Sequence, residues 1–176
     1  MSTEDAIVNR VAASGIITFD LEEFYRPGGR VVVDVKDQLY QGVVLKEKDF
    51  RQFVKSHDWS QYENKYVAIT CSADAIVPVW AYMLIAVALR PWTSTFVFGS
   101  LTDLEEKLFM ESLSAVNWND FTGKKVVVKG CSKVEVPVSV YLEVARNLQP
   151  VVSSLMFGEP CSTVPLYKAS AVDTSK

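Results

Sequence analysis

The sequence predicts an α/β protein built on a small three-layer, mainly parallel sheet. From residue 65 onward, short apolar runs alternate with helical stretches, which is the pattern of parallel strands joined by crossover helices. The first 64 residues add patterns typical of an N-terminal helix and an antiparallel hairpin, so we expect a mixed sheet. With 176 residues, 49% of them hydrophobic, the chain is long enough to bury a core without disulfide or metal staples.

The N-terminal third predicts helices around a pair of strands. Ile7, Val8 and Val11 recur at helical spacing, and Gly15 marks the end of that helix. Residues 27–29 form a Pro-Gly-Gly turn that precedes the hairpin. In chain order, the expected elements are a helix at 4–14, a short strand at 16–19, strands at 30–35 and 42–45 that pair as a hairpin, and a helix at 46–56.

The rest of the chain predicts a doubly wound unit over residues 65–157. Proline stands in the first turn of two of its helices, a position that tolerates proline. We expect a single domain over residues 1–168, to which residues 1–64 contribute the N-terminal helices and hairpin, and a flexible tail at 169–176. The expected elements are strands at 65–70, 94–98, 124–129 and 151–156, and helices at 78–89, 101–116 and 137–148.

The composition excludes several function classes. The formal net charge of -3 provides no basic surface for DNA or RNA, so we expect no nucleic-acid partner. The polar N-terminus carries no apolar signal-peptide region, and the longest apolar stretch, residues 77–89, is too short to span a bilayer. We therefore expect a cytoplasmic chain without a membrane partner.

All three cysteines share one short phrase, in which Cys-Ser is followed a few residues later by Val-Pro. The three copies are Cys71–Pro78, Cys131–Pro137 and Cys161–Pro165. In the reducing cytoplasm, such a set is typical of metal binding or catalysis rather than of disulfides. Each cysteine follows a predicted strand, and the carboxyl ends of parallel strands meet at one edge of the sheet, where open α/β sheets bind ligands.

We therefore predict a metal-binding protein in which Cys71, Cys131 and Cys161 ligate one metal at that edge, with the reaction unknown. Zinc is the expected metal, because three thiolates and a fourth ligand complete its tetrahedron. His57, the only histidine, is the candidate fourth ligand, and Asp58 beside it can orient its ring. Iron or an iron–sulfur cluster held by the three cysteines is the alternative cofactor. The other candidates for the fourth position are Asp74, Glu159 and a water molecule.

Two other interpretations of the cysteines stay open. In the first, the protein binds no metal, and one exposed cysteine at a helix N-terminus acts as a nucleophile or redox sensor. In the second, the cysteines are inert core residues of a structural or interaction domain, which can form a homodimer through its aromatic surface. No GxGxxG, GxxxxGK[ST] or GxSxG pattern indicates a nucleotide site or a serine hydrolase.

Several of these stretches together resemble an uncharacterised bacterial family of short cytoplasmic proteins. They are Cys71–Pro78 with Trp80–Met83, Val128–Ser132, Gly158–Lys168, and the segment from Asp49 to Trp59. The resemblance covers nearly the whole chain. It implies a soluble α/β protein and no assigned reaction, because the family is a domain of unknown function.

Overall fold

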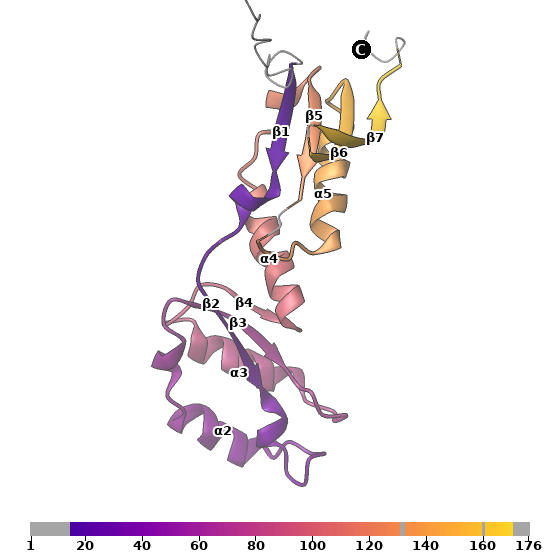
Figure 1. The fold of residues 1–176 in the computed structure, drawn as a ribbon. Helices are drawn as coiled ribbons and strands as arrows, with labels where there is room; N and C mark the ends of the chain where they lie inside the picture. The colour runs from indigo at the N-terminus through magenta and orange to yellow at the C-terminus, as the bar shows by residue number, and fades with distance from the viewer. Residues whose placement is uncertain (1–14, 131–132, 160, 171–176) are drawn as a thin grey trace, which may run out of the picture. The chain divides into compact units, whose positions relative to one another are not determined.

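The chain forms two compact units. A computed structural model describes residues 15–130, 133–159 and 161–170 (Figure 1). One unit, which we name the inserted unit, comprises Arg26–Glu111, and the other, the split unit, comprises Met1–Tyr25 and Ser112–Lys176. The helix expected at 4–14 and most of the tail expected at 169–176 lie outside the described residues.

The inserted unit holds a three-stranded parallel sheet between two helical layers. Its elements are β2 (Gly29–Asp34), α2 (Glu47–Ser56), β3 (Lys65–Thr70), α3 (Val79–Leu89), β4 (Phe96–Phe98) and most of α4 (Leu101–Leu113), with strand order β2-β3-β4. The helices α2 and α3 pack on one face of the sheet, around Phe50 and Ile85. Leu104 and Leu108 of α4 pack against Ala68 of the central strand on the other face. Because both faces are covered, the middle of β3 is apolar throughout.

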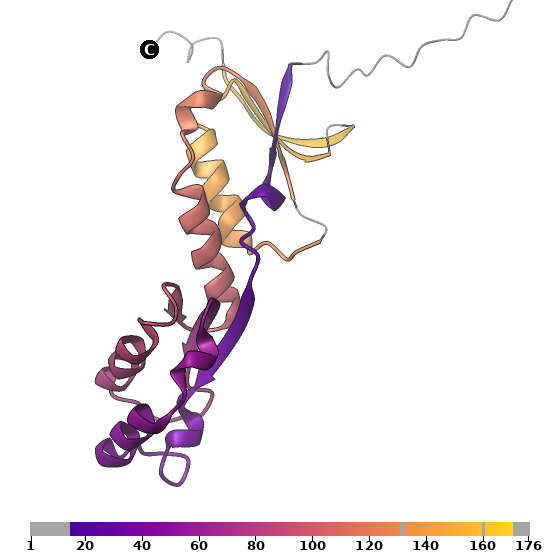
Figure 2. The same cartoon turned by 90° about the vertical axis from the view of Figure 1, so that its left-hand side faces the viewer.

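The split unit holds a mixed sheet with the order β1-β5-β6-β7. Its elements are β1 (Ile16–Asp20), β5 (Lys125–Lys129), α5 (Val138–Leu148), β6 (Ser154–Glu159) and β7 (Ser162–Lys168). The first three strands in this order are parallel, and β7 runs antiparallel to β6. Figure 2 shows α5 against one face of the sheet, and the buried residues of this helix are Val140, Val144 and Leu148.

The predicted α/β class and mixed sheet are confirmed, but the antiparallel hairpin lies elsewhere in the chain. Asp34 ends β2, and its carboxylate accepts the Lys36 N–H at 3.0 Å, which caps the short 3₁₀ helix η2 (Val35–Gln38). The chain therefore turns into a helix where we expected a hairpin. The expected strand at 42–45 is reduced to single bridges of Val44 with Tyr40 and Ile76. Among the described strands, β6 and β7 form the antiparallel pair.

The expected four-stranded parallel sheet over residues 65–157 is also corrected, because its strands belong to two sheets. Strands β3 and β4 pair with β2, whereas β5 and β6 pair with β1. In both sheets, the parallel strands follow one another in chain order. Among the described strands, neither sheet has the reversal of order at which open α/β sheets bind ligands. The single domain over residues 1–168 stays a prediction.

The two units repeat one motif. Residues 59–99 of the inserted unit match the residues 59 positions later without a gap, so that Trp59 corresponds to Trp118 and Pro91 to Pro150. The pairing register follows the same offset, because Val67 pairs with Phe96 in one sheet and Val126 with Leu155 in the other.

The backbone conformation repeats as well. Asn64 and its counterpart Gly123 both have positive φ, at 57° and 71°. Asp34 and Asp20 end the first strand of their units, and each caps a 3₁₀ helix with its carboxylate. We conclude that the chain carries an internal duplication, in which one copy is inserted after the first strand of the other.

Candidate functional site

The predicted metal ligands that the structure describes are divided between the two units. Cys71 directly follows β3, at the carboxyl edge of the sheet of the inserted unit. His57 ends α2 in the same unit. Cys161 lies in the turn between β6 and β7 of the split unit and is exposed. Cys131 lies outside the described residues.

His57 has the contacts of a structural residue. Its Nε2 lies 3.1 Å from the hydroxyl of Tyr62, and its ring centroid is 4.6 Å from that of Trp59. Asp58, which we expected to orient this ring, instead accepts hydrogen bonds from the N–H of Ser60 at 3.0 Å and from its hydroxyl at 2.5 Å. These bonds lower the pKa of the Asp58 carboxyl. The imidazole thus joins the end of α2 to the next turn of the chain.

Cys71 is partly buried and packs against the apolar core of the inserted unit. Its thiol lies 3.6 Å from the carbonyl oxygen of Ala73, a weak hydrogen bond. On the same edge, the carboxylate of Asp34 accepts the N–H and the hydroxyl of Ser72, at 3.1 and 2.6 Å. Burial first, and then the charges of Cys71 and Asp34, raise the pKa of Tyr82. The ammonium of Lys36 lies 3.7 Å from the Asp34 carboxylate, so this edge carries charges of both signs.

The prediction of a metal-binding function is wrong. Among the described residues, no group of three or more His, Cys, Asp and Glu side chains is placed to hold a metal ion. Glu159, a candidate ligand, lies 3.7 Å from the ammonium of Lys129, and Asp74 is exposed. The physical reason is the sheet topology: Cys71 and Cys161 follow strands of separate sheets, so the strand ends that carry them do not share an edge.

The internal duplication explains the Val-Pro part of the phrase in two of its three copies. The turns from Thr70 to Pro78 and from Lys129 to Pro137 have the same length, and each leads from the middle of a parallel array into a helix that begins after proline. In this match, Cys71 corresponds to Gly130 rather than to a cysteine. The Val-Pro part of the phrase therefore reflects a repeated strand-to-helix turn. The signal that sequence reasoning missed is the offset of 59 positions itself.

An exposed apolar row lies on the outer side of α3 and the residues before it. We name Ile76, Val79, Met83 and Val87 the α3 stripe; these side chains are 92, 73, 63 and 72% exposed. The last three recur every four residues, so they stand above one another on one side of the helix. A contiguous exposed apolar patch marks a surface at which something else binds. No helix in the described part of the chain is long and apolar enough to cross a bilayer. The opposite side of α3 faces the core through Ala81, Ile85 and Leu89.

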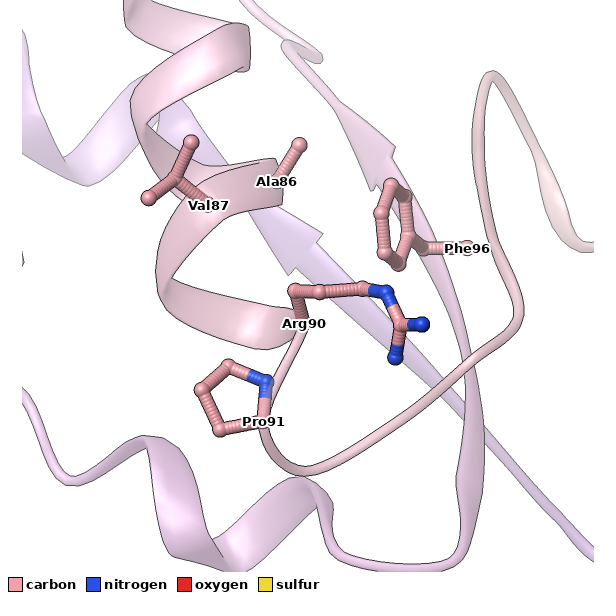
Figure 3. A pocket seen from close by; sticks show the side chains of 5 residues that line it. All are labelled: Ala86, Val87, Arg90, Pro91 and Phe96. Carbon is pink, nitrogen blue, oxygen red and sulfur yellow. The ribbon is translucent and has the colours of Figure 1, made fainter.

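An open apolar pocket continues the stripe at the carboxyl end of α3 (Figure 3). It has a volume of about 440 Å³ and is lined by Ala86, Val87, Arg90, Pro91 and Phe96. The side chain of Arg90 extends from the end of the helix toward the Phe96 side of the pocket. In the described structure, Arg90 makes no ion pair. The pocket thus offers apolar walls and a free positive charge at one rim.

The equivalent helix α5 carries a shorter apolar row. Val138 and Leu142, which match Val79 and Met83, are also exposed, at 73 and 66%. The counterpart of Val87 is Arg146, whose guanidinium lies 2.5 Å from the carboxylate of Glu143. An ion pair therefore interrupts the outer side of α5, whereas the row on α3 is continuous.

Packing in the core that α3 shares with α2 explains why some residues of α3 are apolar, but it does not explain why the stripe is apolar. Trp80, Leu84 and Ala88 match polar residues of α5 and pack against the core of the inserted unit. Val87 is not among these packed residues, so packing among the described residues does not explain why it is apolar.

Comparison with known proteins found one family. A family model described as "Protein of unknown function (DUF2480)" matches residues 5–169. No curated protein and no solved structure matches the chain. The expected resemblance to an uncharacterised family is confirmed, and the match spans both copies of the internal duplication.

Proposed function

The chain belongs to the family of proteins of unknown function DUF2480, and we propose that it is an interaction protein whose binding surface is the α3 stripe. The observation that carries the proposal is the continuous row of exposed apolar side chains on a helix without charged residues. A helix that is apolar on all sides is normally buried on all sides. Among the described residues, packing covers only the inner side of α3, and we propose that a partner covers the outer side.

We propose a second copy of the chain as that partner. The four side chains of the stripe expose roughly 500 Å² per copy, compared with the ~800 Å² that a standard interface buries on each partner. We propose that two further exposed residues supply part of the remaining area: Pro91, which lines the pocket, and Phe98, whose ring packs on Tyr82 of α3. A single self-complementary patch favours a closed two-fold dimer, the commonest form of homo-oligomer.

The cysteines have no chemical role in this proposal. Cys71 packs with the core, and the proposal includes a cytoplasmic location, in which the free thiols of Cys71 and Cys161 stay reduced. The thiol-chemistry alternative stays a prediction that reactivity measurements can test.

The substitution Met83→Glu tests the binding surface. Covering the exposed part of Met83 contributes about 1–2 kcal/mol per copy, and the variant loses this in both copies while placing two carboxylates in the contact. We expect the dimer to weaken at least about 100-fold, since each 1.4 kcal/mol changes the dissociation constant tenfold. Sedimentation velocity measures the change, and circular dichroism checks that the fold is intact.

Leu142→Glu is the matched control. Leu142 has the same place on α5 as Met83 on α3, and nearly the same exposure. We expect L142E to remain dimeric at concentrations at which M83E is a monomer. A wild-type protein that is monomeric at high concentration, or an M83E variant that associates as the wild type does, would refute the proposal.

A further inference from the structure

We infer that two copies of α3 pack antiparallel across a two-fold axis at Met83, so that Ile76 of each copy enters the apolar pocket at the end of the other copy's α3. The inference rests on the proposed function, because it describes how the same stripe meets its copy. Three features of the inserted unit support it: the spacing of the stripe, the position of the pocket, and the charges at the two ends of α3.

The spacing of the stripe is symmetric about Met83. Val79 and Val87 each lie four residues from Met83, which is about 6 Å along the helix axis. In an antiparallel pair centred on Met83, the partner's Val79 therefore lies on Val87. Successive rows four residues apart are the ridges that interlock when two helices pack closely.

The pocket lies where the antiparallel arrangement places the partner's Ile76. It begins at Val87 and continues past the end of α3 to Pro91 and Phe96. Ile76 precedes α3 and is the most exposed large apolar side chain of the stripe. Reversal of the partner helix carries the partner's Ile76 past Val87 toward Arg90, over the pocket. The volume of about 440 Å³ is ample for one isoleucine side chain. A parallel pair would instead place each pocket against the partner's pocket and each Ile76 against the Ile76 of the other copy.

The charges at the two ends of α3 favour the same orientation. Asp74 precedes the helix, Arg90 follows it, and both are exposed. In the described part of the chain, neither side chain makes an ion pair. An antiparallel pair brings Asp74 near the partner's Arg90, whereas a parallel pair brings like charges together. The helix dipoles are opposed in the antiparallel pair as well.

Cysteine cross-linking tests the orientation directly. A disulfide requires Cα atoms within about 7 Å of each other. At a two-fold axis through Met83, the M83C side chains of the two copies meet, whereas the V79C side chains are about 12 Å apart along the axis. Under mild oxidation we expect M83C to form a cross-linked dimer and V79C to form none, while a mixture of V79C and V87C chains forms a 79–87 link. Peptide mass mapping separates these links from links of the native cysteines.

A charge exchange provides the second measurement. We expect Asp74→Arg and Arg90→Glu each to weaken the dimer about threefold to tenfold, and the double variant D74R/R90E to restore the wild-type dissociation constant. Efficient V79C–V79C cross-linking, with a dimer that M83E still abolishes, overturns the antiparallel arrangement and leaves the proposed function intact. A wild-type chain that stays monomeric overturns both.

Discussion

Replacement of Asp34 by alanine tests whether the carboxylate of this residue stabilises the carboxyl edge of the β2-β3-β4 sheet. The carboxylate accepts three hydrogen bonds: from the N–H of Lys36 at 3.0 Å, and from the N–H and hydroxyl of Ser72 at 3.1 and 2.6 Å. It thereby ties the end of β2 to the chain that leaves β3. At about 1 kcal/mol of net stability for each bond, D34A loses about 2–3 kcal/mol of unfolding free energy.

The assay is thermal and urea unfolding followed by circular dichroism. For a chain of this length, the expected loss corresponds to a Tm lower by roughly 4–10 °C. Asp37→Ala is the control, because Asp37 is an exposed carboxylate in the same short helix. A D34A variant within about 0.5 kcal/mol of D37A would refute the reasoning, since changes of that size are typical of ordinary surface positions.

The same contribution depends on pH. Burial alone would raise the pKa of Asp34, but the hydrogen bonds from Ser72 and Lys36 outweigh it and hold the pKa below its ordinary value. A depressed pKa in the folded state means that the stabilisation is fully present above the pKa of the unfolded chain. It is lost as the pH falls through the folded value. We therefore expect the difference between wild type and D34A to be constant near neutral pH and to shrink below about pH 4.

Four further outcomes are expected. Val87→Arg, which gives α3 the residue that α5 carries at the same place, should weaken the dimer without loss of Tm, as sedimentation and thermal unfolding will show. Phe50→Ala should lower the unfolding free energy by about 3–5 kcal/mol in urea titrations, because Phe50 is fully buried in the core of the inserted unit. Gly99→Ala should cost about 1–3 kcal/mol, since φ is 135° there and a Cβ would meet the Asp103 carboxylate; Gly29→Ala, which meets only the Lys65 side chain, is its control. Toward a thiol reagent, Cys161 should react like a free thiol and Cys71 more slowly, and a Cys71 that reacts faster than free cysteine would instead support thiol chemistry.

Much of the fold is predictable from local patterns in the sequence. The strands at residues 65–70 and 124–129 and the helices at 78–89 and 137–148 all form within a residue or two of their expected bounds. These elements are predictable because apolar periodicity and proline placement are local properties. Strand pairing depends on distant residues, so the division into two sheets is not visible in any single segment. The offset of 59 positions would have revealed it, because two copies of one motif each require their own sheet.

The candidate site was less predictable, and for a physical reason. The Cys-Ser phrase that the cysteines share suggested that their side chains meet at one edge of a sheet. Whether they meet depends on sheet topology, and the strands before Cys71 and Cys161 belong to different sheets. The α3 stripe was not predictable either, because nearly every residue of this helix is apolar. Residues 77–89 are so uniformly apolar that the sequence predicts a buried helix and does not mark which side remains exposed. Only the packing of α2 and the sheet against α3 shows that Met83 and Val87 face outward.

The most direct test of the dimer surface is the rate at which dilute peroxide oxidises Met83. The thioether of an exposed methionine is oxidised readily, and contact with a partner slows the reaction. Met156, on β6 of the split unit, is the internal reference in the same sample. If α3 is the dimer surface, the oxidation rate of Met83 relative to Met156 falls as the protein concentration is raised through the dissociation constant of the dimer. A relative rate that is the same at all concentrations, in a protein that sediments as a dimer at the highest of them, would contradict the account.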